Sequence, residues 1–452
     1  MQRRNGFHVY INITNLNQIV LDEEKRTGKV NHSIHAMDTF FSSVERFGKH
    51  LSPNKLVVEK ITGSRLHLYV LDDIVNGFEV VKRVSLFAYC LTHIINREIS
   101  KYKTLDDFQI QIGTAYGKFY DFVFAGEQEY SEETTIGYAA NFAAKLQVLA
   151  PVFSIAVSED IFESLSANEQ RVFHKVSSAS IKKYGQSCYY TSLLSSFATG
   201  FSISEKDRSD ILSRANDLNL SDIDYSGVRQ TLDFNRVSTM QCKRLNGIPL
   251  FADVRGFTSQ FAADDSNLEE MSGKTQEILT KLYQTTKGSG GVHVQFQGDR
   301  ELALFHDVPE QAAGGALAAK VSCFKPAVFA AMRMVDVVKP LSVHIGVGED
   351  YGRLFATKIG ARGQKDNILL GETVIYADYM EDSRAGEDQV AITKEVFQGL
   401  KEEDSHLADL FQPQGDYYIA TIGYSQYVQS RQRDRLMANT KQNNYNGGWG
   451  EE

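Results

Sequence analysis

Two aspartates beside glycine turns are the first candidates for chemistry in this 452-residue chain. Asp253 ends an apolar run and precedes an Arg-Gly turn, while Asp299 follows Gly298 and precedes an alternating apolar stretch. Two carboxylates at strand ends can converge, and hard oxygen ligands of this kind suit Mg²⁺ or Mn²⁺ ions that carry substrate phosphates. Either aspartate alone is better explained as a solvated turn residue. The pair, in this order, is therefore what points to a metal site.

A second polar pair follows Gly137, where Asn141 and Lys145 stand four residues apart in an otherwise apolar stretch. This spacing puts both side chains on one face of a helix. Such a face could simply be solvated, as most polar helix faces are. The alternative is that an amide and an ammonium group point together at a ligand.

The elements around these residues occur twice along the chain. The β-rich stretch 7–13 matches 250–254, and a hairpin around Thr62-Gly63-Ser64 matches the one around Gly298. Ile112-Gly113 and Ile345-Gly346 are each followed by Tyr-Gly and a basic residue, and we align these two glycines. Such self-similarity predicts an internal duplication. The expected domains are 1–195 and 246–428, with a polar linker at 196–245 and a flexible tail at 429–452.

The two copies differ at the positions that could do chemistry. Their alignment places Asn12 opposite Asp253 and Ser64 opposite Asp299, and neutral side chains cannot offset a divalent cation as two carboxylates do. In the later helix the losses run the other way, since Ile375 and Tyr379 occupy the places of Asn141 and Lys145. One copy keeps the acidic pair and the other keeps the polar helix face.

The sequence Leu250 to Thr258, followed later by Gly298-Asp299, resembles the class III nucleotide cyclases. The resemblance implies an α/β fold, described more closely as an α+β sandwich of ferredoxin-like domains. It also implies two tandem cyclase-homology domains packed head to tail as an intramolecular pseudo-heterodimer. Such a molecule has one complete site and one degenerate site, and needs no homodimer for activity.

The resemblance also implies a reaction, in which a ribose 3′-oxygen attacks the α-phosphorus of a nucleoside triphosphate and pyrophosphate leaves. Two Mg²⁺ or Mn²⁺ ions would be held by Asp253, Asp299 and the Val254 carbonyl. Asn141 would orient the ribose, and Lys145 would stabilise charge on the α-phosphate in place of the family's usual arginine. The further residues expected to contact substrate are Phe257, Thr258, Lys182, Lys183 and Arg362.

Base identity is read in this family by residues that correspond to Lys60 and Thr134. A lysine only donates, whereas a threonine hydroxyl donates or accepts, which suits adenine or cytosine better than guanine. In architecture the chain resembles the bacterial pyrimidine cyclases of Pycsar anti-phage defence, which make cyclic CMP or cyclic UMP for a separate effector protein. A pyrimidine cyclase is the favoured interpretation. An adenylate cyclase and a nucleotide-binding pseudo-cyclase remain as alternatives.

Composition limits the other possibilities. A net charge of −9 argues against a broad nucleic-acid surface, and 42% apolar residues predict ample globular cores. Four scattered cysteines show no zinc spacing and favour a reducing compartment. The N-terminus lacks the apolar core of a signal peptide, so we expect a cytoplasmic protein without membrane insertion.

Overall fold

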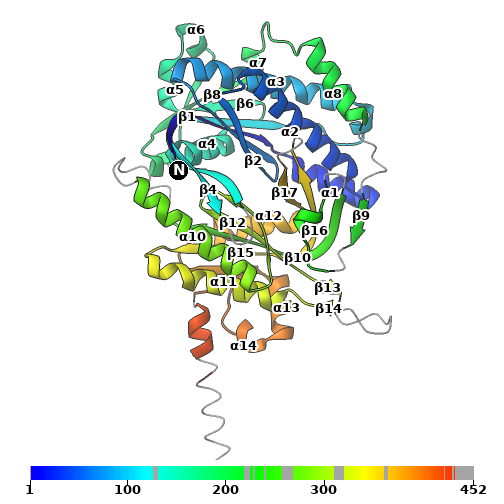
Figure 1. Cartoon of the computed structure of the whole chain (residues 1–452), viewed down its shortest axis with the longest axis vertical. Coiled ribbons are helices and arrows are strands. Elements are labelled where there is room, and N and C mark those ends of the chain that lie inside the picture. Colours follow the sequence, from blue (N-terminus) through cyan, green and yellow to red (C-terminus); the bar gives the residue numbers. More distant parts are fainter. Residues whose placement is uncertain are drawn as a thin grey trace, which may run out of the picture.

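The structure is a computed structural model that describes residues 2–125, 131–217, 224–227, 230–238, 241–256, 268–309, 320–360, 365–421, 423–429 and 432. It contains two large mixed sheets with helices packed against them. Figure 1 shows the first repeat, blue to cyan, lying against the second, green to orange. Phe257, Thr258 and Arg362, which were expected at the site, lie outside the described residues.

The first repeat contains eight strands and seven α-helices within its described residues. The strands are β1 (Gln2–Ile13), β2 (Leu56–Thr62), β3 (Arg65–Val70), β4 (Ile110–Ala125), β5 (Ser131–Ile136), β6 (Ser154–Val157), β7 (His174–Ser177) and β8 (Cys188–Leu193). The helices are α1 (Leu16–Thr27), α2 (Asn31–Leu51), α3 (Ile74–Arg97), α4 (Tyr138–Leu149), α5 (Glu159–Ser164), α6 (Ala167–Gln170) and α7 (Leu194–Phe197), with 3₁₀ turns η1 (Ser100–Tyr102) and η2 (Ala179–Tyr184).

The second repeat is built in the same way. Its strands are β10 (Gln241–Val254), β11 (Val292–Gln297), β12 (Arg300–His306), β15 (Ile345–Glu349), β16 (Gly352–Ile359), β17 (Asp366–Leu370), β18 (Gln389–Thr393), β19 (Gln412–Gln414) and β20 (Tyr417–Ala420), with a small ribbon of β13 (Val308–Pro309) and β14 (Lys320–Val321). Its helices are α10 (Leu268–Gly288), α11 (Phe324–Val338), α12 (Glu372–Tyr379), α13 (Lys394–Glu403) and α14 (Ser405–Ala408), with the 3₁₀ turn η6 (Lys339–Leu341) and the π-helical turn η7 (Met380–Arg384).

The two sheets have the same strand order. The first runs β2-β3-β1-β4-β6-β8-β7 and the second runs β11-β12-β10-β15-β18-β20-β19. In each, the equivalent strands β4 with β6 and β15 with β18 pair in parallel, because a helix crosses between them. The hairpins β2–β3 and β11–β12 even carry a bulge at the same place. The duplication inferred from sequence is thus present in the fold.

The register of the repeats corrects one alignment. Gly113 pairs with Tyr10, and the structurally equivalent pair in the second repeat is Gly348 with Phe251. A Cβ on Gly113 would lie 2.3 Å from the Ala143 carbonyl oxygen, and a Cβ on Gly348 would meet the backbone of the corresponding helix turn just as closely. Our alignment of Gly113 with Gly346 is therefore wrong by two residues. The strand comes close to the helix backbone at Gly348, and a residue with a Cβ atom would not fit there.

Each repeat sends one strand pair into the core of the other. Phe124 and Ile136, on the β4–β5 arm, are buried in the second repeat's core, where the Phe124 ring lies 4.7 Å from that of Phe296. In return Phe355 and Ile368, on the β16–β17 arm, are buried in the core of the first repeat. Burying such a side chain contributes about 1.5–3 kcal/mol. The exchange of arms fixes how the repeats face each other.

Two equivalent hydrogen bonds join the repeats along their seam. The Ile61 amide donates to Asp366 Oδ2 at 2.7 Å, and the Phe296 amide donates to Glu132 Oε1 at 3.0 Å. Ile61 and Phe296 occupy equivalent positions in β2 and β11, as Glu132 and Asp366 do in β5 and β17. The contact is therefore reciprocal, with β2 meeting β17 and β11 meeting β5, as a pseudo-two-fold axis requires.

The segment expected as a linker contains regular structure. The helix α8 (Glu205–Asp217) packs on α2, and its Arg214 forms an ion pair with Asp38 at 2.8 Å. The short strand β9 (Asp224–Gly227) pairs with the start of β10, which begins at Gln241 and so before the expected boundary at 246. Within the described residues, none of the helices has the length and low charge needed to cross a membrane.

Candidate active site

Adjacent strands bring the two aspartates together. Asp253 is the last residue but one of β10 and pairs across the ladder with Arg300, the residue directly after Asp299. Facing residues in an antiparallel pair have Cα atoms about 4.5–5.5 Å apart. Gly256 and Gly298 have φ angles of 69° and 72°, a conformation that favours glycine, so each carboxylate stands beside a turn that only glycine makes without strain. The local sequence thus places both carboxylates at one corner of the second sheet.

The electrostatics of this corner favour a bound cation. Burial and the charge of Asp253 raise the pKa of Asp299 well above its usual value, and the charge of Glu381 adds to this. Two carboxylates this close repel each other unless a positive charge lies between them. A divalent ion supplies that charge, and carboxylate oxygens are its preferred ligands. The donor set therefore fits Mg²⁺ or Mn²⁺.

Two arginines stand behind the aspartates and are held by one acid. Arg255 lies 3.5 Å from Asp253 and 2.6 Å from Glu381, measured between guanidinium nitrogen and carboxylate oxygen. Arg300 lies 2.6 Å from the other oxygen of Glu381 and 2.5 Å from Asp378. Glu381 is 2% exposed and sits in the π-helical turn η7. Because Glu381 engages both guanidinium groups, the arginines offset only part of the charge on the two aspartates.

Asn141 reaches this corner from the first repeat. It lies in the first turns of α4, and a Cβ atom built on Gly298 would be 3.9 Å from Asn141 Oδ1. The amide of the first repeat therefore borders the turn that carries Asp299.

The lysines expected near the phosphates lie on the same repeat as Asn141. Lys145 is one turn further along α4, is half-buried, and makes no hydrogen bond or ion pair within the described part of the chain. Lys182 is exposed in the 3₁₀ turn η2, while the side chain of Lys183 lies outside the described residues. Val254, whose carbonyl was expected as a ligand, ends β10 with its side chain in the core.

Tyr184 is a site residue that the sequence analysis missed. Its ring packs on Phe142 of α4 at 5.1 Å. Burial raises the pKa of Tyr184 to about 12, with the charges of Asp299 and Asp253 adding to the effect. Its hydroxyl thus lies on the first repeat within the field of both aspartates. The sequence signal for it is its place directly before Gly185, next to Lys182 and Lys183.

The residues expected to read the base are already engaged with protein groups. Lys60 is 3% exposed, and its ammonium donates to Glu132 Oε1 at 2.7 Å and to the Phe296 carbonyl at 2.9 Å. Thr134 is also buried, and its hydroxyl donates to Glu59 at 3.4 Å. Both residues lie on the seam, and both side chains already bond to protein groups, which leaves one Lys60 donor and the acceptor side of the Thr134 hydroxyl.

At the equivalent corner of the other repeat, Ser64 donates a 2.7 Å hydrogen bond to Asn12 Oδ1. Both groups are neutral and satisfy each other. Ser64 and Ile375 line a small pocket of about 110 Å³ together with Arg300. Asp378 is the acidic residue that lines this pocket, and it is paired with Arg300, so within the described residues this corner lacks the carboxylate pair that suits a divalent ion.

Comparisons with known proteins bear on the fold of this chain. Residues 244–429 match the family described as the adenylate and guanylate cyclase catalytic domain. The whole chain is similar to the crystal structure of a class III adenylyl cyclase-like ATP-binding protein from Pseudomonas aeruginosa. The TM-score is 0.68 at 17% identity, with 94% of this chain and 90% of that chain covered. At this identity the likeness shows the fold, which is that of class III cyclases in tandem.

Single catalytic domains match a smaller part of the chain. The adenylyl cyclase CyaB from P. aeruginosa has 19% identity over 39% of this chain and 93% of its own, with a TM-score of 0.32. The guanylate cyclase domain of RhGC from Catenaria anguillulae, solved with GTP, has 18% identity over 39% of this chain and 96% of its own, also with a TM-score of 0.32. No curated protein matches the chain.

Proposed function

We propose that this protein is a nucleotide cyclase that converts a nucleoside triphosphate to a 3′,5′-cyclic mononucleotide and pyrophosphate. One active site lies on the seam between the repeats. The observation that carries the proposal is the meeting of Asn141, from the first repeat, with the Gly298–Asp299 turn of the second, beside Asp253. The match of residues 244–429 to the cyclase catalytic domain supports it.

Asp253, Asp299 and the Val254 carbonyl would hold two divalent ions, which class III cyclases generally use. When bound, the ions lower the pKa of the ribose 3′-hydroxyl and neutralise charge on the leaving phosphates. Arg255, fixed by Glu381, lies 3.5 Å from Asp253 and would help to keep that carboxylate in place without displacing the ions. Because carboxylates held in this way lose little freedom on binding, the corner is ready to receive a metal-bound triphosphate.

The first repeat would supply the groups that act on the reacting atoms. The Asn141 amide orients the ribose so that the 3′-oxygen faces the α-phosphorus in line with the leaving group. The Lys145 ammonium, one turn along the same helix face, stabilises the charge that develops on the α-phosphate. A lysine lacks the two-pronged geometry of arginine, so it acts here as a point charge.

For the base we propose a pyrimidine, with CTP slightly favoured over UTP, and an anti-phage second messenger read by a separate effector protein as the role. The support is the resemblance in architecture to stand-alone pyrimidine cyclases. Adenylate cyclase activity is the alternative. A third candidate is nucleotide binding without turnover, which is favoured by lysine at the position of the usual arginine and by the similarity to a cyclase-like ATP-binding protein.

One experiment separates these readings. The purified chain is incubated with each of the four nucleoside triphosphates and Mn²⁺ or Mg²⁺, and products are identified by mass spectrometry. We expect a cyclic pyrimidine nucleotide as the main product, and cyclic AMP would identify the alternative. Nucleotide that binds but is recovered unchanged under every condition would contradict the cyclase proposal and leave the pseudo-cyclase.

A further inference from the structure

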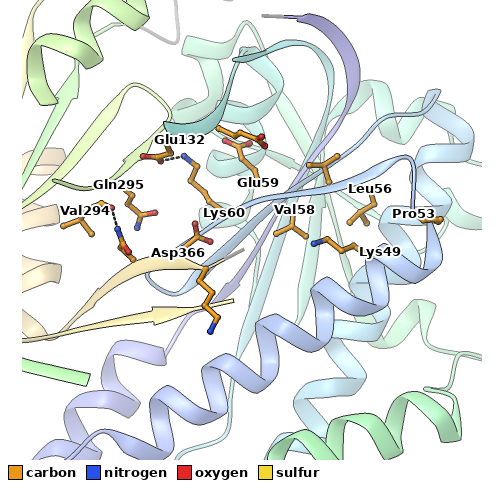
Figure 2. Close-up of a pocket in the computed structure, with 14 residues that line it drawn as sticks. Lys49, Pro53, Leu56, Val58, Glu59, Lys60, Glu132, Val294, Gln295 and Asp366 are labelled. Atoms are coloured by element: carbon orange, nitrogen blue, oxygen red, sulfur yellow. Dashed lines mark hydrogen bonds and ion pairs between the residues drawn. The ribbon is translucent and has the colours of Figure 1, made fainter. Parts of the chain in front are cut away.

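A pocket of about 650 Å³ lies on the seam between the repeats (Figure 2). It is lined by Val58 and Lys60 of the first repeat and by Val294, Gln295 and Asp366 of the second. Lys60 and Gln295 are equivalent residues of β2 and β11, so the pocket lies close to the pseudo-two-fold axis. Its volume is in the range of small-molecule sites.

Most polar groups of this pocket already have partners. Lys60 uses two of its three donors on Glu132 and on the Phe296 carbonyl. Asp366 accepts from the Ile61 amide, and the Asn367 amide donates to the Val294 carbonyl at 3.1 Å. Two of these bonds, from Lys60 to the Phe296 carbonyl and from the Ile61 amide to Asp366, join the repeats, so a ligand that displaced them would open the seam.

Gln295 is the exception. Its side chain is 5% exposed, and neither its Nε2 nor its Oε1 atom has a hydrogen-bond partner among the described residues. Figure 2 shows the end of this side chain directed toward Lys60 and Asp366, into the space that the pocket residues surround. A buried amide without partners costs free energy unless something supplies them. The group that completes it must offer an acceptor to Nε2 and a donor to Oε1 side by side.

An adjacent donor and acceptor on a flat ring is the hydrogen-bonding edge of a nucleobase, which glutamine binds through both amide atoms. The Val58 and Val294 side chains offer apolar contact, as ring-binding pockets do. Gln295 also stands four residues before Asp299 on the same hairpin, about 13 Å along the chain at strand spacing. This is comparable with the extended length of a nucleoside monophosphate.

We infer that the seam pocket receives a nucleobase and that Gln295 of the second repeat, in place of Lys60 of the first, reads its hydrogen-bonding edge. The inference rests on the proposed function only for the source of the base. That source is either the triphosphate substrate or a free nucleoside that binds beside it.

The first test needs neither metal nor turnover. Binding of cytidine, uridine, adenosine and guanosine to the full chain is measured by calorimetry in the presence of a chelator. We expect at least one nucleoside to bind, and Gln295→Met, which keeps the volume and removes both hydrogen bonds, to weaken it about tenfold. Gln297→Met, on the same strand but outside the pocket lining, is the matched control. No binding by the wild type at about millimolar nucleoside, or equal binding by Gln295→Met, would overturn the inference.

A second measurement excludes a merely structural role for the amide. Since Gln295 has no protein partner to lose, the thermal unfolding midpoint of ligand-free Gln295→Met should equal or exceed that of the wild type. A clear drop would mean that the amide holds the fold, and would contradict the inference.

The source of the base is decided by turnover. If the substrate's base occupies the pocket, Gln295→Met changes the relative kcat/KM among the four triphosphates. If a free nucleoside occupies it, these ratios stay constant while nucleoside binding falls. In the Asp299→Ala variant nucleoside binding should persist although turnover is lost. A wild-type protein that binds nucleosides but makes no cyclic product would refute the proposed function and leave the present inference standing.

Discussion

The two equivalent corners of the seam differ in whether their polar groups are satisfied. At one corner the neutral side chains of Asn12 and Ser64 form a hydrogen bond with each other. At the other, Asp253 and Asp299 repel each other, and the pKa of Asp299 is raised well above its usual value. The same fold therefore carries a relaxed copy and a strained copy of one site. Strain of this kind is expected where a protein keeps a group for a ligand.

The largest expected effect is on product formation when Asp299, one of the two facing carboxylates, is removed. Asp299→Ala should reduce cyclic-product formation to background, because one carboxylate cannot hold both ions. Ser64→Ala, the same truncation at the equivalent residue of the relaxed corner, should leave the rate near that of the wild type. Initial rates with saturating Mn²⁺ and triphosphate measure both. Equal losses in the two variants would reverse the assignment of the repeats.

A smaller effect is expected on the helix that faces the aspartates. Asn141→Ala should lower kcat by about 10²–10³-fold, the usual cost of losing one positioned polar group at a reacting centre. Ile375→Ala changes the equivalent residue of α12, where no reaction takes place, and should lower kcat only slightly. Single-turnover rates on both variants check this, with circular dichroism to confirm folding. A kcat of Asn141→Ala close to the wild-type value would remove Asn141 from the catalytic groups.

The smallest expected effect is on folding stability and concerns the acidic residues that join the repeats. Lys60 and the neighbouring His293 hold the pKa of Glu132 at about 2 despite its burial, whereas burial raises the pKa of Asp366 to about 7. Between pH 4 and 7 the unfolded chain releases the Asp366 proton first. The wild type therefore loses stability as pH rises through this range, and the loss is complete above about 7.

Asp366→Asn keeps an acceptor for the Ile61 amide and has no proton to release. We expect it to match the wild type in chemical denaturation at pH 4 and to be more stable at pH 8. Glu132→Gln should act in the opposite sense, because it leaves the buried Lys60 without its carboxylate. An Asp366→Asn variant less stable than the wild type at pH 8 would show that the Asp366 charge stabilises the seam.

The sequence was sufficient to predict the fold, because the internal duplication is visible in the residue types of the two copies. Asn12, Ser64, Ile375 and Tyr379 are informative without coordinates. The two-residue error at Gly346 arose because Ile-Gly occurs next to the position that needs glycine, and only the contact of Gly348 with its helix distinguishes them. Side-chain partners could not be predicted, since the Lys60–Glu132 pair joins residues 72 apart.

The assigned roles of Asn141, Lys145, Asp253 and Asp299 remain predictions that the variants above test. Gln295 shows what the sequence hides. Nothing marks one glutamine in a strand as special, and only the pocket and its unpaired amide do so. Tyr184 was hidden for a related reason, because its importance depends on a neighbouring repeat whose approach no local pattern encodes.

The exchanged arms have a consequence for how the protein is made and used. While the ribosome has released only the first half, the hydrophobic interior of that half lacks Phe355 and Ile368 and cannot close completely. Once both halves are joined, each holds the other at a fixed high local concentration. Contact between the halves therefore does not depend on protein concentration, and the seam should persist on dilution.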